Sequence, residues 1–125
     1  MHYRLKTSKK TEEIFNMISQ REHLQPFALS KIAIALAIRD NYKASNDDNN
    51  TDSNGLELNK QTITSDNDLL FKLLIELNEN RHIEEADYFP EIVKKYLDYG
   101  AELLEQEYKY SRNIYTHLIN LEKGI

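Results

Sequence analysis

The sequence predicts a small, mainly α-helical domain of four to five helices with one or two short strands, and it predicts that this domain is oligomeric. Two stretches carry the prediction. Between Phe27 and Ile38 only two side chains are polar, and residues 69–77 are mostly leucine, isoleucine and phenylalanine. Helices that are apolar on most sides must be covered on most sides. Two such helices in a chain of 125 residues favour association between copies.

The length fits a single domain over residues 1–125, since a domain usually has roughly 100–200 residues. No stretch approaches the roughly 18 apolar residues of a membrane span, and the N-terminus lacks the apolar run of a signal peptide. We therefore expect a cytoplasmic protein with no membrane partner. The chain has no cysteine and only three glycines, which excludes thiolate chemistry and a glycine-rich phosphate loop in it. No metal and no cofactor are expected.

The first forty residues predict a strand followed by two helices. Residues 3–6 alternate apolar and basic side chains, which is the period of a strand with one buried face. Thr7 or Ser8 then caps a helix with acids in its first turn, where the macrodipole favours them. Pro26 suits the first position of the second helix, residues 26–39, because its missing N–H is no loss there.

The second helix has two interpretations. It is either the central helix of a monomeric bundle, packed by its own chain, or a helix that also meets a second copy of the protein. We favour the second interpretation, because Ser30, Ala33 and Ala37 are small residues at helical spacing that allow a neighbour to approach closely. These three residues are the predicted oligomer interface.

The rest of the chain predicts a loop, an extended segment and further helices. Residues 44–55 are polar and acidic, so we expect a mobile loop there. Residues 55–64 alternate apolar and polar side chains, which indicates a short strand or an extended crossing segment. Ser65 then caps a third helix. Pro90 opens the last helical stretch, which ends in an amphipathic turn or two around residues 114–119.

The net charge of −5 conceals a basic N-terminal part. Residues 1–43 carry eight Lys and Arg against four acids, whereas residues 44–125 carry eight against seventeen. Cations beside a helix start suit phosphate oxygens, since lysines supply charge, an arginine supplies a fork and the helix end supplies N–H donors. The candidate DNA-binding residues are Arg4, Lys6, Lys9, Lys10, Arg21 and Lys31.

Two further clusters each have an ordinary structural explanation. Residues 108–112 interleave aromatic and basic side chains that could stack on exposed bases, although Tyr108 also continues a helical core stripe. Residues 81–87 hold a histidine among acids, but acids at a helix start explain that pattern better than a divalent metal site does. No histidine has an acid or nucleophile at motif spacing, so enzymatic activity has no support.

Four segments also form an extended pattern along the chain: RLKTSK, PFALSKIAIALAIR, GLELNKQTIT, and YFP followed by GAELLEQEYKYS. In order and spacing this pattern resembles the DndE family of DNA sulfur modification proteins, over nearly the whole chain outside the acidic loop. One departure lies in the turn before the second helix. Members of that family often have a glycine there, whereas residues 21–24 of this chain are REHL.

The resemblance implies participation in DNA phosphorothioation, the replacement of a non-bridging phosphate oxygen by sulfur. It implies a small helical homotetramer that binds duplex DNA, with a preference for nicked DNA, through surface lysines. It also implies three protein partners: a cysteine desulfurase, a reductase-like protein and an ATPase. A chain without cysteine or a phosphate loop fits the DNA-holding role in such a system.

Two alternative functions stay open from the residues alone. A strand followed by two helices is also the order of ribbon–helix–helix repressors, in which a strand from each of two subunits enters the major groove. Such a repressor would read bases through Arg4 and Lys6. The other alternative is a scaffold subunit of the same complex that touches only proteins, through its acidic body.

Overall fold

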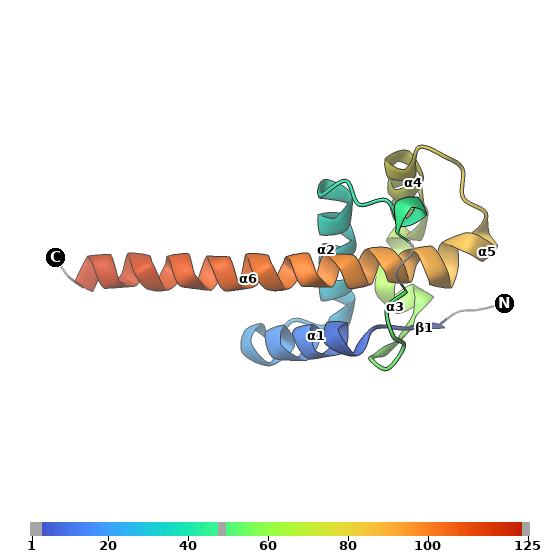
Figure 1. The fold of residues 1–125 in the computed structure, drawn as a ribbon. Helices are drawn as coiled ribbons and strands as arrows, with labels where there is room; N and C mark the ends of the chain where they lie inside the picture. Colours follow the sequence, from blue (N-terminus) through green and yellow to red (C-terminus); the bar gives the residue numbers. More distant parts are fainter. Residues whose placement is uncertain (1–3, 48–49, 124–125) are drawn as a thin grey trace.

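The computed structural model describes residues 4–47 and 50–123, with side chains described in this part except those of Ser65 and residues 113–123. It shows a helical domain crossed by one long helix (Figure 1). The elements in chain order are β1 (Arg4–Lys6), α1 (Lys9–Glu22), α2 (Pro26–Arg39), a 3-10 turn (Ala44–Asn46), β2 (Glu57–Asn59), α3 (Lys60–Thr64), a second 3-10 turn (Ser65–Asn67), α4 (Asp68–Glu79), α5 (Glu85–Asp87), a π-helical stretch (Tyr88–Ile92) and α6 (Val93–Lys123). The predicted mainly α domain with short strands is confirmed. Its oligomeric state stays a prediction.

The two strands form one antiparallel sheet, in which Leu5 of β1 lies opposite Leu58 of β2. Both leucines are buried while their strand neighbours are exposed, which confirms the predicted strand with one buried face. The second predicted strand is shorter than its pattern suggested, because Lys60–Thr64 is helical. In a ribbon–helix–helix protein the strand pairs with a second subunit, whereas β1 finds its partner within its own chain.

Helix α1 begins at the predicted cap. The Ser8 side chain accepts a hydrogen bond from the Thr11 backbone N–H at 3.0 Å. The helix ends at His23, whose N–H donates to the Ser19 carbonyl at 2.8 Å and whose φ of 59° is left-handed. Residues other than glycine adopt this conformation at a cost. His23 therefore occupies a glycine-like position in the turn before α2.

Helix α2 has the predicted bounds, and α6 crosses it directly (Figure 1). Ser30, Ala33 and Ala37 are all 0% exposed within the single chain. A Cβ added to Gly100 of α6 would come within 1.7 Å of the Ala33 carbonyl oxygen, so the two backbones nearly touch. The prediction that these three small residues meet a second copy is therefore wrong, because α6 of the same chain already covers this face.

The later helices begin at different residues from those predicted. Ser65 opens a 3-10 turn, and α4 begins at Asp68. Pro90 follows a cis peptide bond inside the π-helical stretch, and Phe89 before it is extended, with φ −127° and ψ 129°. A residue that precedes proline avoids the helical region. The regular helix α6 consequently begins only at Val93. The predicted amphipathic turn at residues 114–119 lies in α6, but its side chains are outside the described part.

The acidic segment 44–55 is described at residues 44–47 and 50–55, where it contacts the domain. Ala44 is buried, and its backbone N–H donates to Glu79 at 2.7 Å. The Asp52 carboxylate accepts from the Lys9 backbone N–H at 2.8 Å. These partners come from α4 and α1, so the composition of the loop could not reveal them. Its mobility stays a prediction.

The core lies between α2 and α6 and is closed on one side by α1. Its buried side chains include Phe15 and Ile18 of α1, Leu29 and Ile34 of α2, and Leu97 of α6. Helix α6 has 31 residues and continues past the ends of α1 and α2 (Figure 1). None of the helices in the described part is both long enough and apolar enough to cross a membrane.

Candidate nucleic-acid interface

The junction between β1 and α1 gathers four of the six candidate cations. Arg4 and Lys6 alternate with buried Leu5, so both are exposed on the outer face of β1. Lys9 and Lys10 follow at the exposed start of α1, immediately after the Ser8 cap. We call these four residues the cationic junction. The structure thus confirms that the first four candidates are neighbours in the fold.

The other two candidates lie apart from the cationic junction. Arg21 is exposed in the last turn of α1, about 18 Å beyond Lys9 at 1.5 Å per residue. Lys31 is partly buried on α2, and its ammonium nitrogen lies 5.8 Å from the centre of the Phe27 ring. The six residues therefore do not form one continuous patch.

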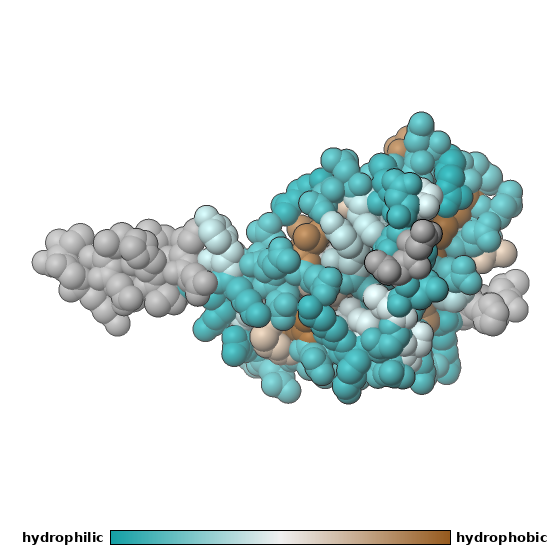
Figure 2. Space-filling model, in the orientation of Figure 1, coloured by the Kyte–Doolittle hydropathy of each residue, from teal (hydrophilic) through white to brown (hydrophobic). Residues whose placement is uncertain are grey.

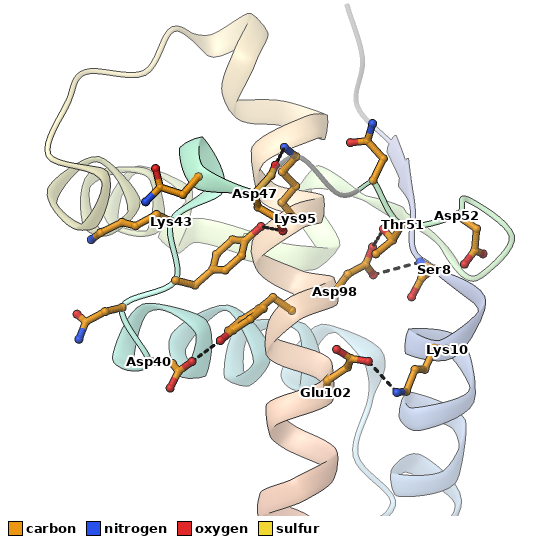
Figure 3. Close-up of a pocket in the computed structure, with 15 residues that line it drawn as sticks. Ser8, Lys10, Asp40, Lys43, Asp47, Thr51, Asp52, Lys95, Asp98 and Glu102 are labelled. Atoms are coloured by element: carbon orange, nitrogen blue, oxygen red, sulfur yellow. Dashed lines mark hydrogen bonds and ion pairs between the residues drawn. The ribbon is translucent and has the colours of Figure 1, made fainter.

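Most of the cationic junction is matched by acids. The ion pairs are Arg4 with Glu57 at 3.3 Å, Lys9 with Glu12, and Lys10 with Glu102 at 2.7 Å. Figure 3 shows the pair formed by Lys10 and Glu102 across the gap between α1 and α6. Within the described part, Lys6 is the member of the junction without an ion-pair partner. The local positive charge is consequently smaller than the sequence suggested.

The paired lysines keep their charge firmly. A hydrogen bond and the charge of Glu12 raise the pKa of Lys9, and Glu102 raises the pKa of Lys10 in the same way. Both lysine side chains stay more than half exposed, at 57% and 58%. Exposed pairs of this kind contribute little stability because water screens them. A phosphate oxygen can therefore replace either carboxylate at small cost.

Two of the backbone donors at the start of α1 are already occupied. Ser8 takes the Thr11 N–H, and Asp52 takes the Lys9 N–H at 2.8 Å. The Lys9 and Asn54 N–H groups in turn lower the pKa of Asp52. An acid of the chain thus stands where a helix start would otherwise bind a phosphate. The expectation that this helix end offers free donors is wrong for the Lys9 and Thr11 N–H groups.

Asp98 fastens the cationic junction to the domain. Its carboxylate is buried and accepts from the Ser8 N–H at 3.1 Å, the Thr11 hydroxyl at 2.7 Å and the Lys94 ammonium at 2.6 Å. Thr51 donates to the same carboxylate (Figure 3). Asp98 thereby joins α6, the start of α1 and the acidic segment. Sequence reasoning missed this residue, and the available signal was a single acid within an apolar helical stripe.

An open pocket of about 840 Å³ lies beside Asp98, between α6 and the acidic segment (Figure 3). Acids outnumber lysines in its lining. The charged lining residues are Lys10, Asp40, Lys43, Asp47, Asp52, Lys95, Asp98 and Glu102. An acid-rich wall repels a phosphate backbone. Lys10 of the cationic junction lines this pocket, but the acids around it make the pocket an unfavourable site for a phosphate backbone.

In the aromatic and basic cluster at residues 108–112, Tyr108 already contacts other parts of the domain. The Tyr108 hydroxyl donates to Glu22 at 2.9 Å, and the Arg112 guanidinium lies 5.7 Å from the centre of the Tyr108 ring. Tyr108 also packs against the core, which favours the structural interpretation over base stacking. Tyr110 stays 64% exposed.

Around His82 and elsewhere in the described part, no three His, Asp or Glu side chains are placed to hold a metal.

The fold defines the class of this protein as a small helical domain that carries a two-stranded sheet and is crossed by one long helix. The family model for "DNA sulphur modification protein DndE" matches residues 4–112, which include every element up to most of α6. The chain belongs to the DndE family. Among curated proteins, no sequence matches it significantly.

Two solved structures share the fold. One is DndE from Escherichia coli B7A, described as involved in DNA phosphorothioation modification. It is 15% identical, with a TM-score of 0.66, and the match covers 83% of this chain and 97% of that chain. The other is a DndE G21/24K mutant involved in DNA phosphorothioation, at 14% identity and a TM-score of 0.62, with coverage of 85% and 99%.

Proposed function

We propose that this protein is the DNA-binding subunit of a DNA phosphorothioation system, in which it holds duplex DNA and prefers nicked duplex. The family match over residues 4–112 carries the proposal, because the matched region includes all six candidate cations. The chain has no cysteine, so sulfur transfer belongs to other proteins. The proposed role is binding without catalysis and without a cofactor, in the cytoplasm where the DNA lies.

The cationic junction is the proposed contact with the phosphate backbone. Lys6 is expected to contribute most to phosphate binding, because its charge has no ion-pair partner in the described part of the chain. Arg4, Lys9 and Lys10 add to it by exchanging exposed carboxylates for phosphates. Arg21 and Lys31 lie apart on this chain, so they would contact DNA only where the duplex extends beyond the junction.

Self-association would multiply these contacts, and we propose a homotetramer. One junction with four cations, three of them paired with acids, grips a duplex weakly. Several copies arranged symmetrically place several junctions on one duplex without changing the net charge per chain. A nick makes the duplex easier to bend, so more of these junctions could engage at once. This is the proposed origin of the nick preference.

The proposed protein partners are the other members of such a system: a cysteine desulfurase, a reductase-like protein and an ATPase. Residues 44–125 hold seventeen acids against eight Lys and Arg. This acidic part would repel DNA and is the proposed surface for proteins. A scaffold subunit that never touches DNA is the alternative.

Gel-shift titration at two salt concentrations, on one duplex that is either intact or nicked, separates these functions. We expect a steep salt dependence whose log–log slope falls by about 0.9 for each phosphate contact that is lost. Lys6→Ala and Lys10→Ala should both reduce the slope. Lys109→Ala is the matched control, since Lys109 is an exposed lysine on α6 that pairs with Glu105. No shift at low salt would identify the scaffold subunit.

A further inference from the structure

Residues 50–55 of the acidic segment lie across the start of α1, and we call them the strap. Residues 50–54 are exposed, and the surface where Figure 1 places the junction of β1 and α1 is mostly hydrophilic (Figure 2). At one end of the strap, the Thr51 hydroxyl donates to the buried Asp98 carboxylate. At the other end, the Gly55 N–H donates to the Thr7 carbonyl at 2.9 Å. The strap is therefore fixed at both ends, while its middle faces water.

The middle of the strap carries one acid, Asp52, which lies at the start of α1 (Figure 3). Its carboxylate accepts from the Lys9 N–H at 2.8 Å and from the Asn54 N–H at 3.1 Å. These two N–H groups, and to a smaller extent the charge of Lys94, hold the pKa of Asp52 below its ordinary value. Asp52 is therefore ionised at neutral pH, and the start of α1 already holds an anion of its own chain.

The strap also covers Lys94, which is not one of the six candidate cations. The Lys94 ammonium donates to the Thr51 hydroxyl at 2.7 Å, to the Asp52 carbonyl at 2.8 Å and to the Asp98 carboxylate at 2.6 Å. Its side chain is only 16% exposed, compared with 57% for that of Lys9. If the strap moved away, Lys94 would lose two of these three acceptors and would be uncovered.

A DNA phosphate would use the same groups that the strap occupies. Phosphate oxygens accept from backbone N–H groups at a helix start and from nearby ammonium groups. Here the Lys9 N–H and the Lys94 ammonium already have strap atoms as partners. A phosphate and the Asp52 carboxylate repel each other, so the two anions compete for this position. Lys9 and Lys94 do not line the acid-rich pocket, so a phosphate held by them would lie outside it.

The strap can release Asp52 without opening the core. The hydrogen bonds of its carboxylate from the Lys9 and Asn54 N–H groups are both exposed to solvent. Local opening of an exposed segment with few buried apolar contacts costs far less free energy than global unfolding. An anion that binds more strongly than one carboxylate could therefore displace the strap while the domain stays folded.

We propose that the strap is an autoinhibitory contact, in which Asp52 occupies the position of a DNA phosphate at the start of α1. The DNA backbone displaces Asp52 and uncovers Lys94, which becomes a further phosphate contact. This inference rests on the DNA binding in the proposed function and adds its regulation. It does not depend on the number of copies in the assembly.

The first test removes the charge of Asp52 and keeps an acceptor oxygen. Asp52→Asn should bind duplex DNA about twofold to fivefold more tightly than the native chain at low salt, because the competing charge is gone. The matched control is Asp66→Asn, which removes the same charge from an exposed position before α4. Gel-shift titration measures the affinities, and circular dichroism verifies the fold. Equal gains for the two variants would show that net charge alone is responsible and would overturn the inference.

The second test loosens the strap without changing any charge. Thr51→Val removes the hydroxyl that joins the strap to Asp98 and Lys94, so DNA affinity should rise in the same direction. Ser53→Ala, at an exposed position of the same strap, should leave the affinity unchanged. If Thr51→Val binds DNA no more tightly than Ser53→Ala does, the strap does not compete with DNA.

A third measurement follows the strap directly in the native protein. The Asn54 N–H donates to Asp52, so its hydrogen exchange, observed by NMR, should become faster when duplex DNA displaces the carboxylate. Slower exchange in the complex would mean that the strap closes on the DNA, and unchanged exchange would mean that it stays in place. Either result would refute displacement.

The same gel shifts separate this inference from the proposed function. If the native chain shifts DNA and Asp52→Asn binds no more tightly than Asp66→Asn, the autoinhibition fails and the DNA role stands. If neither the native chain nor Asp52→Asn shifts DNA at low salt, the DNA role fails and the autoinhibition fails with it. A shift by Asp52→Asn but not by the native chain or Asp66→Asn would support both.

Discussion

Gly100 of α6 lies against the backbone carbonyl of Ala33 in α2, so closely that a Cβ at Gly100 would come within 1.7 Å of that oxygen. Glycine inside a helix normally costs about 1 kcal/mol relative to alanine. Here the glycine allows the backbones of α2 and α6 to come into direct contact. The contact explains why the small residues of α2 are needed within a single chain.

Gly100→Ala should therefore lower the free energy of unfolding by about 2 kcal/mol or more, despite the gain in helix propensity, because neither backbone can move away freely. Urea denaturation measures the change. Ala33→Val and Ala35→Val form a matched pair on one helix. Ala33 is 0% exposed and Ala35 is exposed, so only the first should be strongly destabilising. Equal effects of the two would contradict this packing.

The carboxylate of Glu79 should make stability depend on pH. Burial raises the pKa of Glu79, but hydrogen bonds from the Tyr96 hydroxyl and from the Ala44 and Ser45 N–H groups hold its pKa below the ordinary value. The unfolded chain then binds the proton more readily than the folded chain does. The stability that ionised Glu79 contributes is fully present above its ordinary pKa of about 4.3. It is lost as the pH falls through the lower pKa that Glu79 has in the folded protein.

Glu79→Gln should consequently be less stable than the native chain at pH 7, and its stability should change less than that of the native chain between about pH 5 and pH 3. Urea denaturation at several pH values tests this expectation. Glu13→Gln is the control, since Glu13 is exposed on α1. If the two variants follow the same pH profile, Glu79 does not carry the acid sensitivity.

The turn between α1 and α2 should gain stability from a glycine. His23 adopts φ 59°, as do Asn41 at 60° and Asn80 at 59°, and the short side chain of asparagine can hydrogen-bond locally in this region whereas that of histidine is bulkier. His23→Gly should raise the free energy of unfolding by about 0.5 kcal/mol, since the relieved strain exceeds the entropy gained by the unfolded chain. Asn41→Gly should change it less. Thermal unfolding of both variants gives the comparison, and a loss of stability in His23→Gly would show that the histidine makes a contact worth more than the strain.

Several elements were readable from short stretches of sequence. Ser8 as a cap, Pro26 and Arg39 as the bounds of α2, and the alternation around Leu5 depend on neighbours within a few residues. The family could also be recognised, because its pattern of ordinary residues extends along most of the chain. Local backbone preferences and periodicity suffice for features of this kind.

The candidate surfaces depended on contacts between distant segments. Arg4 is paired with Glu57, 53 positions away, and nothing around the cationic residues indicated that acids of β2 and α6 would neutralise them. The apolar surface of α2 is evident from the sequence, but the sequence alone does not determine that Gly100 lets α6 cover this surface while the leucines of α4 stay exposed to water. The spacing of apolar residues along a helix shows that one of its faces must be covered. Only the packing of the whole chain determines which apolar faces are covered within the protomer and which stay exposed.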